Sequence, residues 1–270
     1  MWQLDCPDLE APAEVRASKT RKTEESGDDC VSEWARTRLG FVADPVQERV
    51  LNSRNRRSIL NCTRQWGKST VTAAKAVHRA FTEKGSLVIV VSPTARQSGE
   101  FVRKAAEFVR RLGIRPRGDG DNEISLELPN GSRIIGLPGT EATVRGFSAV
   151  TLALVDEAAR VSDELYLAIR PMLAVSEGDL WLMSTPYGKQ GFFWETWERG
   201  GPEWQRVRVT AADCPRISAE FLRGEQKAMS ERWFRQEYYC EFGENRQSVF
   251  DMDLVDRALS EDFGALIFQR

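Results

Sequence analysis

The sequence predicts an α/β fold: a mostly parallel central sheet flanked by helices, with an added β-hairpin. Residues 86–91 form a continuous, β-branched apolar run, typical of a strand buried on both faces of a parallel sheet. Residues 58–61 are a second apolar run, followed by a polar loop and a segment with helical spacing. Asn130-Gly131 between two alternating runs is a strong hairpin signal. Parallel strands with helical connections and one hairpin account for all three patterns.

Length and composition set the limits on function. The 270 residues, 41% of them hydrophobic and 29% charged, suffice for one large domain with appendages or two small ones. With a net charge of -2, contact with a polyanion must use a local patch. No apolar run is long enough to span a membrane, so we expect no membrane association. Five cysteines without C-x-x-C argue against a disulfide framework and a zinc site, and favour a reducing cytosol.

The N-terminal part combines a polar arm with two predicted helices. Residues 1–32 have the composition of a mobile or peripheral arm, and residues 33–39 are predicted to form a short helix. Asp44 as N-cap and Pro45 at the first helical position mark the start of the next helix. Gln47 in this helix is a candidate for reading adenine through its amide group; the alternative is a glutamine that faces solvent.

The loop after residues 58–61 is the main functional signal. It resembles G-x-x-x-x-G-K-S/T, with Cys62 in place of the first glycine, and it lies between a strand and a helix, as a phosphate-binding loop does. In that interpretation Lys68 contacts the β- and γ-phosphates, and Ser69 holds Mg²⁺. The alternative is a surface turn that starts a helix. The predicted nucleotide-binding residues of this loop are Thr63, Arg64, Gln65, Trp66, Gly67, Lys68, Ser69 and Thr70.

The middle of the chain supplies further elements of the sheet. A long amphipathic helix is predicted for residues 95–112, and its basic side chains either face solvent or contact a polyanion. Residues 124–128 and 132–137 form the predicted hairpin. Residues 139–148 are a polar loop that contains Arg145.

The strand of residues 150–157 ends in two adjacent acids, Asp156 and Glu157. The carboxyl edge of such a sheet is where α/β proteins bind ligands. Strand alternation is expected to send the two side chains in different directions, one toward Mg²⁺ and the other toward the γ-phosphate and water. The strand of residues 179–186 carries Ser184 and Thr185 to the same edge, either to sense the γ-phosphate or simply to form a turn.

The C-terminal part is predicted to contain a last strand, residues 204–209, and two helices, residues 218–229 and 230–240. The second helix carries an aromatic group, which forms either core or interface packing or a platform for stacking bases. Its members are Trp233, Phe234, Tyr238 and Tyr239.

In this order the motifs resemble the N-terminal ATPase domain of phage large terminases, from about residue 44 to residue 250. The segment Thr63-Arg64-Gln65-Trp66-Gly67-Lys68-Ser69 is fairly specific to this family, and the full set of motifs in this order is more specific. The family's first loop position is often not glycine. The other matching segments are Ser92-Pro93-Thr94, Arg145-Gly146, Leu154-Val155-Asp156-Glu157-Ala158-Ala159, Ser184-Thr185-Pro186-Tyr187-Gly188, Phe234-Arg235-Gln236-Glu237-Tyr238 and Glu241-Phe242.

The resemblance implies a RecA-like P-loop NTPase of the ASCE class and an Mg-dependent ATPase. Lys68 would bind the phosphates, Ser69 and Asp156 would hold Mg²⁺, and Glu157 would orient the attacking water. Arg64 and Arg145 are alternative arginine fingers, in cis and in trans. Ser184 and Thr185 would couple hydrolysis to movement.

The resemblance also implies the surroundings of the protein. Expected partners are double-stranded DNA, a portal or prohead, a small terminase subunit and further copies in a ring, in the cytoplasm of the infected host cell. We expect an ATPase domain at residues 33–245, including a helical subdomain at about 211–245, and a linker at 246–270 toward an absent nuclease domain, so no nuclease activity in this chain. A helicase-like ATPase and a non-catalytic nucleotide-binding module are the competing interpretations.

Overall fold

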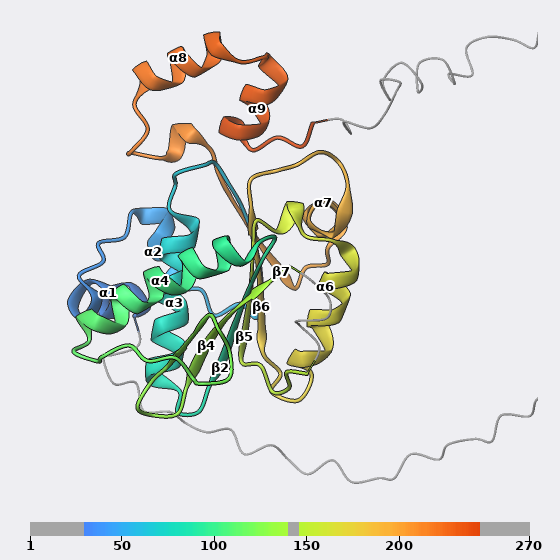
Figure 1. Cartoon of the computed structure of the whole chain (residues 1–270). Coiled ribbons are helices and arrows are strands. Elements are labelled where there is room, and N and C mark those ends of the chain that lie inside the picture. The colour runs from blue at the N-terminus through green and yellow to red at the C-terminus, as the bar shows by residue number, and fades with distance from the viewer. Residues whose placement is uncertain (1–29, 140–145, 244–270) are drawn as a thin grey trace, which may run out of the picture.

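A computed structural model describes residues 30–139 and 146–243. They form one seven-stranded sheet, in the order β3-β4-β2-β5-β6-β1-β7 (Figure 1). Every strand pair is parallel except the β3–β4 hairpin. The strands are β1 (Arg57–Cys62), β2 (Leu87–Ser92), β3 (Ser125–Glu127), β4 (Arg133–Pro138), β5 (Leu152–Asp156), β6 (Asp179–Ser184) and β7 (Trp204–Val209).

Helices cover both faces of the sheet, and two more lie beyond its carboxyl edge (Figure 1). One face is covered by α1 (Val31–Leu39), α2 (Pro45–Leu51), α3 (Lys68–Thr82) and α4 (Ala95–Arg111). The other face is covered by α6 (Asp163–Ile169) and α7 (Gly191–Arg199). The pair beyond the edge is α8 (Ala219–Ala228) and α9 (Glu231–Tyr239). Short 3-10 turns follow β5, α6 and β7, at Ala158–Arg160, Arg170–Leu173 and Ala211–Asp213.

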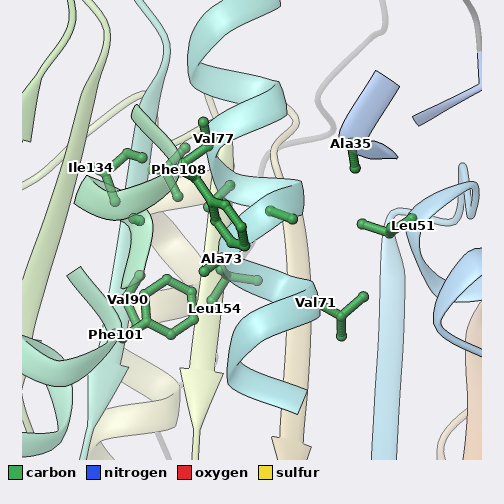
Figure 2. Close-up of a cluster of buried hydrophobic side chains, with 14 of the residues drawn as sticks. Ala35, Leu51, Val71, Ala73, Val77, Val90, Phe101, Phe108, Ile134 and Leu154 are labelled. Atoms are coloured by element: carbon green, nitrogen blue, oxygen red, sulfur yellow. The ribbon is translucent and has the colours of Figure 1, made fainter. Parts of the chain in front are cut away.

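The core on the α3 side fixes the helix that carries the loop. Figure 2 shows Ala73 and Val77 of α3 beside Phe108 of α4 and near Leu154 of β5. All four side chains are buried. Because this face of α3 is held against the sheet, its first turn at Lys68 has a fixed position at the sheet's carboxyl edge.

Local sequence signals explain where the helices near the site begin. Asp44 Oδ1 accepts hydrogen bonds from the backbone N–H groups of Val46 and Gln47, and Gln47 Oε1 accepts one from the Asp44 N–H. This capping box, with Pro45 in the first turn, starts α2 as predicted. Thr94 caps α4 through its hydroxyl, which accepts a hydrogen bond from the Gln97 N–H.

The α/β fold, the parallel sheet and the hairpin are as the sequence predicts. The helices α6 and α7 were not predicted. The first has only seven residues and the second nine, too short for a clear helical period. Helix α1 begins at Val31, inside the end of the predicted arm; residues 1–29 of that arm and residues 246–270 lie outside the described residues. Among the residues described, none of the helices has the length and apolarity that crossing a membrane requires.

Candidate nucleotide-binding site

The loop between β1 and α3 is anchored at both ends. Cys62 and Trp66 are fully buried, and Gly67 adopts a left-handed φ of 95° as the N-cap of α3. A Cβ at Gly67 would lie 3.1 Å from Gln47 Nε2. Cys62 is packed in the core beside α3, so a side chain is accommodated where the motif expects glycine. Burial raises the pKa of its thiol well above the usual value. Helix geometry leaves the first two N–H groups of α3, those of Lys68 and Ser69, without an intrahelical acceptor, which suits an anion.

Two acids at the end of β5, Asp156 and the following Glu157, face the loop across the carboxyl edge of the sheet. Lys68 Nζ lies 2.9 Å from Glu157 Oε1, and the Ser69 hydroxyl donates a 3.0 Å hydrogen bond to Asp156 Oδ2. The two carboxylates therefore meet different loop residues, as expected. The reason differs from the expected strand alternation: β5 ends at Asp156, and Glu157 takes a left-handed φ of 53° that turns its side chain.

Burial and charge set the protonation of this group. Burial would by itself raise the pKa of Glu157, but Lys68, with smaller contributions from Arg160 and Arg64, holds the pKa below the usual value. For Asp156 burial dominates and raises the pKa. Burial would lower the pKa of Lys68, but Glu157 and Asp156 together raise it. Lys68 and Glu157 are therefore a charged pair at neutral pH.

Two arginines lie near the acids, and only one was predicted. Arg64 Nε donates a 2.5 Å hydrogen bond to Glu237 Oε2 of α9. Arg160, in the turn after β5, lies 3.3 Å from Glu157 Oε2. Its position three residues after Glu157 is the only sequence signal for this contact. The other candidate finger, Arg145, lies outside the described residues.

Gln47 of α2 contacts the loop through its side-chain amide. Its side chain is 2% exposed, so the solvent-facing alternative is wrong. Its Nε2 donates a 2.9 Å hydrogen bond to the Trp66 carbonyl while its Oε1 accepts from Asp44. Both ends of the amide are bonded to the protein.

Ser184 and Thr185 lie buried where β6 ends, between β5 and the loop strand β1. The Ser184 hydroxyl donates to the Thr185 carbonyl at 2.8 Å, and the Thr185 hydroxyl donates to the Cys62 carbonyl at 3.0 Å. The second bond joins the end of β6 to Cys62, the last residue of β1, immediately before the loop.

A cavity of about 280 Å³ opens beside the loop. Arg64 and Gln65 of the loop line one side, and the α8–α9 pair lines the other. Phe221 on α8 is 48% exposed at this cavity. The predicted aromatic group is divided: Phe234 and Tyr238 are buried against Ala211, as packing predicts, and Tyr238 also reaches the cavity. The remaining lining residues are Arg216, Ile217 and Ser218.

The donor set at Ser69 and Asp156 fits a magnesium ion. Mg²⁺ prefers hard oxygen ligands and is commonly held by one or two protein groups, waters and substrate phosphates. A hydroxyl and a carboxylate oxygen converge here within 3.0 Å. In the described parts of the chain, no cluster of three or more histidine, cysteine or acidic side chains suggests another kind of metal site.

The fold is an α/β sheet of RecA-like architecture, in which β1, the strand before the loop, and β5, the strand that ends at Asp156, are separated by β6. The chain matches the family described as terminase large subunit, T4likevirus-type, N-terminal, over residues 59–257, and it belongs to that family.

Relatives and solved structures agree with this membership. The terminase large subunit of Thermus phage G20c is 26% identical over 248 residues, covering 78% of this chain and 51% of the relative. That of Escherichia phage T5 is 24% identical over 171 residues, covering 61% and 39%. The chain thus spans about half the length of the first curated relative and a smaller share of the second.

Two solved structures show the same fold. The large terminase ATPase domain of Thermus phage P74-26 matches with a TM-score of 0.69 at 24% identity, covering 77% of this chain and 97% of that one. The large terminase of a thermophilic bacteriophage, in complex with ATP-gamma-S, matches with a TM-score of 0.57 at 15% identity, covering 78% and 51%.

Proposed function

We propose that this chain is the Mg-dependent, ATP-hydrolysing motor domain of a terminase large subunit. The observation that carries the proposal is the double contact at the loop: Lys68 to Glu157 at 2.9 Å and Ser69 to Asp156 at 3.0 Å. A cation and a hydroxyl on a phosphate-binding loop, each facing a carboxylate at a strand end, are the parts that ATP hydrolysis requires.

The residues divide the work by charge. Lys68 exchanges its contact with Glu157 for the β- and γ-phosphates, because a triphosphate brings more negative charge to the ammonium. Glu157, ionised because its pKa is held low, is then free to accept a hydrogen bond from the attacking water. Ser69 and Asp156 hold Mg²⁺, which neutralises phosphate charge when bound. The loop N–H groups from Arg64 to Ser69 hold the phosphate oxygens, whereas those of Thr63 and Thr70 donate to the Val209 and Gly67 carbonyls.

The cavity beside the loop is our candidate for the base. It is lined by two loop residues, so a nucleoside attached to phosphates in the loop reaches it, and Phe221 and Ile217 offer apolar surface to a purine. Gln47 then acts mainly by supporting the Trp66 carbonyl. Gln47 can bind adenine only if its amide gives up the hydrogen bond to Asp44 or the one to Trp66.

Family membership extends the proposal from ATP hydrolysis to DNA packaging. The proposed role is the translocation of double-stranded DNA into a prohead, in the cytoplasm of the infected host cell. Proposed partners are the portal, a small terminase subunit and further copies in a ring. Ser184 and Thr185 are the proposed coupling segment, because Thr185 bonds to Cys62, the residue immediately before the loop.

Calorimetry with Mg·ATP and a turnover assay test the enzymatic part. Lys68→Ala is expected to lose nucleotide binding. Glu157→Gln is expected to lose turnover by at least about 100-fold while keeping or improving ATP affinity, since Lys68 loses a competing partner. Glu100→Gln, an acid of α4 paired with Arg103, is the matched control and should change neither. Undiminished turnover in Glu157→Gln removes Glu157 from the mechanism, and absence of Mg·ATP binding in the wild type ends the proposal.

Two further assays test the motor part. Double-stranded DNA and proheads are expected to stimulate ATPase activity without strand separation; strand separation would favour a helicase. Mixing Arg145→Ala with Lys68→Ala subunits is expected to restore activity if Arg145 acts in trans. Failure to restore activity in assembled rings would leave Arg64 as the finger in cis.

A further inference from the structure

A carboxylate outside the acid pair also faces the loop. Glu237 on α9 accepts a 2.5 Å hydrogen bond from Arg64 Nε. The side chain of Glu237 is 10% exposed, whereas that of Arg64 is 62% exposed. Glu237 is therefore held by its surroundings, whereas the position of the Arg64 side chain depends on its contact with Glu237.

The end of α9 is attached to the loop strand by several other bonds. The Thr63 hydroxyl donates to the Glu237 carbonyl at 3.0 Å, and Asn61 Nδ2 donates to the Cys240 carbonyl at 3.0 Å. The Cys240 thiol donates to the Val209 carbonyl at the end of β7. Because the Glu237 carbonyl and the chain three residues later are both held, the Glu237 carboxylate has a defined position relative to the loop.

The ion pair uses only one of the nitrogens of Arg64. Within residues 30–139 and 146–243, the hydrogen bond to Glu237 through Nε is the only one that the Arg64 side chain makes. Its two terminal NH2 groups remain available to a ligand. After Lys68 and Arg160, Arg64 also contributes to the low pKa of Glu157. The positive charge of Arg64 therefore acts on the carboxylate that faces Lys68.

We propose that Glu237 is a positioning residue, which holds Arg64 by Nε so that its two terminal nitrogens face the phosphates bound at the loop. This inference rests on the proposed ATPase function. A guanidinium can be held on one edge by a carboxylate while it donates from the other to phosphate oxygens. Lysine carries its three donors on one nitrogen and lacks the planar fork that lets an arginine donate from opposite edges. Without Glu237, an exposed arginine loses the contact that orders it, and ordering is what speeds the reaction.

The test compares variants that separate tethering from charge. Glu237→Ala removes the tether but leaves the backbone bond from Thr63, and it is expected to lower kcat by about 10- to 100-fold with little change in ADP affinity. Glu237→Gln keeps an acceptor and should retain more activity than Glu237→Ala. Arg64→Lys keeps the charge but loses the planar group, and it should be as impaired as Arg64→Ala. In an Arg64→Ala background, Glu237→Ala should cause no further loss.

Glu225→Gln is the matched control, because Glu225 is another acid of the same helical pair but accepts from the Tyr238 hydroxyl instead. It should leave kcat unchanged. A second readout is the affinity for ATP-gamma-S relative to ADP, which should fall in Glu237→Ala and stay constant in Glu225→Gln. Thermal unfolding of each variant shows that a loss of kcat is not a loss of fold.

Three results would overturn the positioning role. They are an unchanged kcat in Glu237→Ala, a further loss in the Arg64→Ala background, or a raised preference for ATP-gamma-S. The last would mean that Glu237 withholds Arg64 from phosphate. Failure of the proposed function is distinct, because the wild type would then bind neither Mg·ATP nor ADP.

Discussion

The side-chain amide of Gln47 donates a 2.9 Å hydrogen bond to the carbonyl of Trp66, in the middle of the phosphate loop. The same amide closes the capping box of α2. The start of α2 and the bend of the loop therefore depend on one another, although the two residues are 19 positions apart. This relationship predicts a role for Gln47 that does not involve the base.

Gln47→Ala is expected to weaken binding of tripolyphosphate as well as ATP, because the loop that holds phosphate loses its support. It should also cost about 1–2 kcal/mol of unfolding free energy, since a buried carbonyl and a helix N-terminus lose a partner. Calorimetry with both ligands measures the first effect and urea unfolding the second. Weaker ATP binding with unchanged tripolyphosphate binding would instead assign Gln47 to the adenine.

Gly67→Ala is expected to impair phosphate binding by distorting the loop. Gly67 has a φ of 95°, which costs any other residue about 1–3 kcal/mol, and an added Cβ would press on Gln47 Nε2 at 3.1 Å. Gly85→Ala is the control, because it shares a positive φ but its added Cβ meets nothing within 4 Å. Equal losses of tripolyphosphate affinity in the two variants would contradict the prediction.

Asp156→Asn is expected to abolish Mg-dependent turnover and yet to stabilise the nucleotide-free protein by about 1 kcal/mol at pH 7. Burial raises the pKa of Asp156 in the folded state. As the pH rises above 3.8, the unfolded state therefore loses this proton before the folded state does, and the free energy of unfolding falls. The advantage of the variant should therefore grow as pH rises from that value toward neutrality. Urea unfolding across this range measures it.

The exposed Asp121→Asn serves as the control for this comparison and should show no such trend. An Asp156→Asn protein less stable than wild type at pH 7 would mean that attraction to Lys68 outweighs burial.

The cysteines are expected to differ sharply in reactivity toward iodoacetamide. Cys30 is exposed, and hydrogen bonds led by that from Ser32 lower its pKa, so it should react first among the four cysteines in the described part of the chain. Cys62 is buried with a raised pKa, and burial raises the pKa of Cys240 to about 12. Peptide mapping should find these two, and buried Cys214, modified only after unfolding. Rapid labelling of Cys62 in the folded protein would show that the loop opens.

Much of the fold could be predicted because its signals are local. The runs that became β2, β5 and β6 are buried on both faces, and such strands need continuous apolar sequence. The start of α2 and the β3–β4 hairpin follow from capping and turn residues. Helix α7 lacks such signals, because Phe192, Phe193 and Trp194 are consecutive and hide the helical period.

By itself the sequence determined which groups could do chemistry: a lysine and a serine at the start of a helix, and two acids at the end of a strand. Only the tertiary structure decided how they meet, because β6 separates β1 from β5 and sets the distance across which Lys68 reaches Glu157. It also paired Arg64 with Glu237, 173 residues further along the chain. No local pattern encodes such a contact, since it depends on how the chain returns to the loop after the sheet is complete.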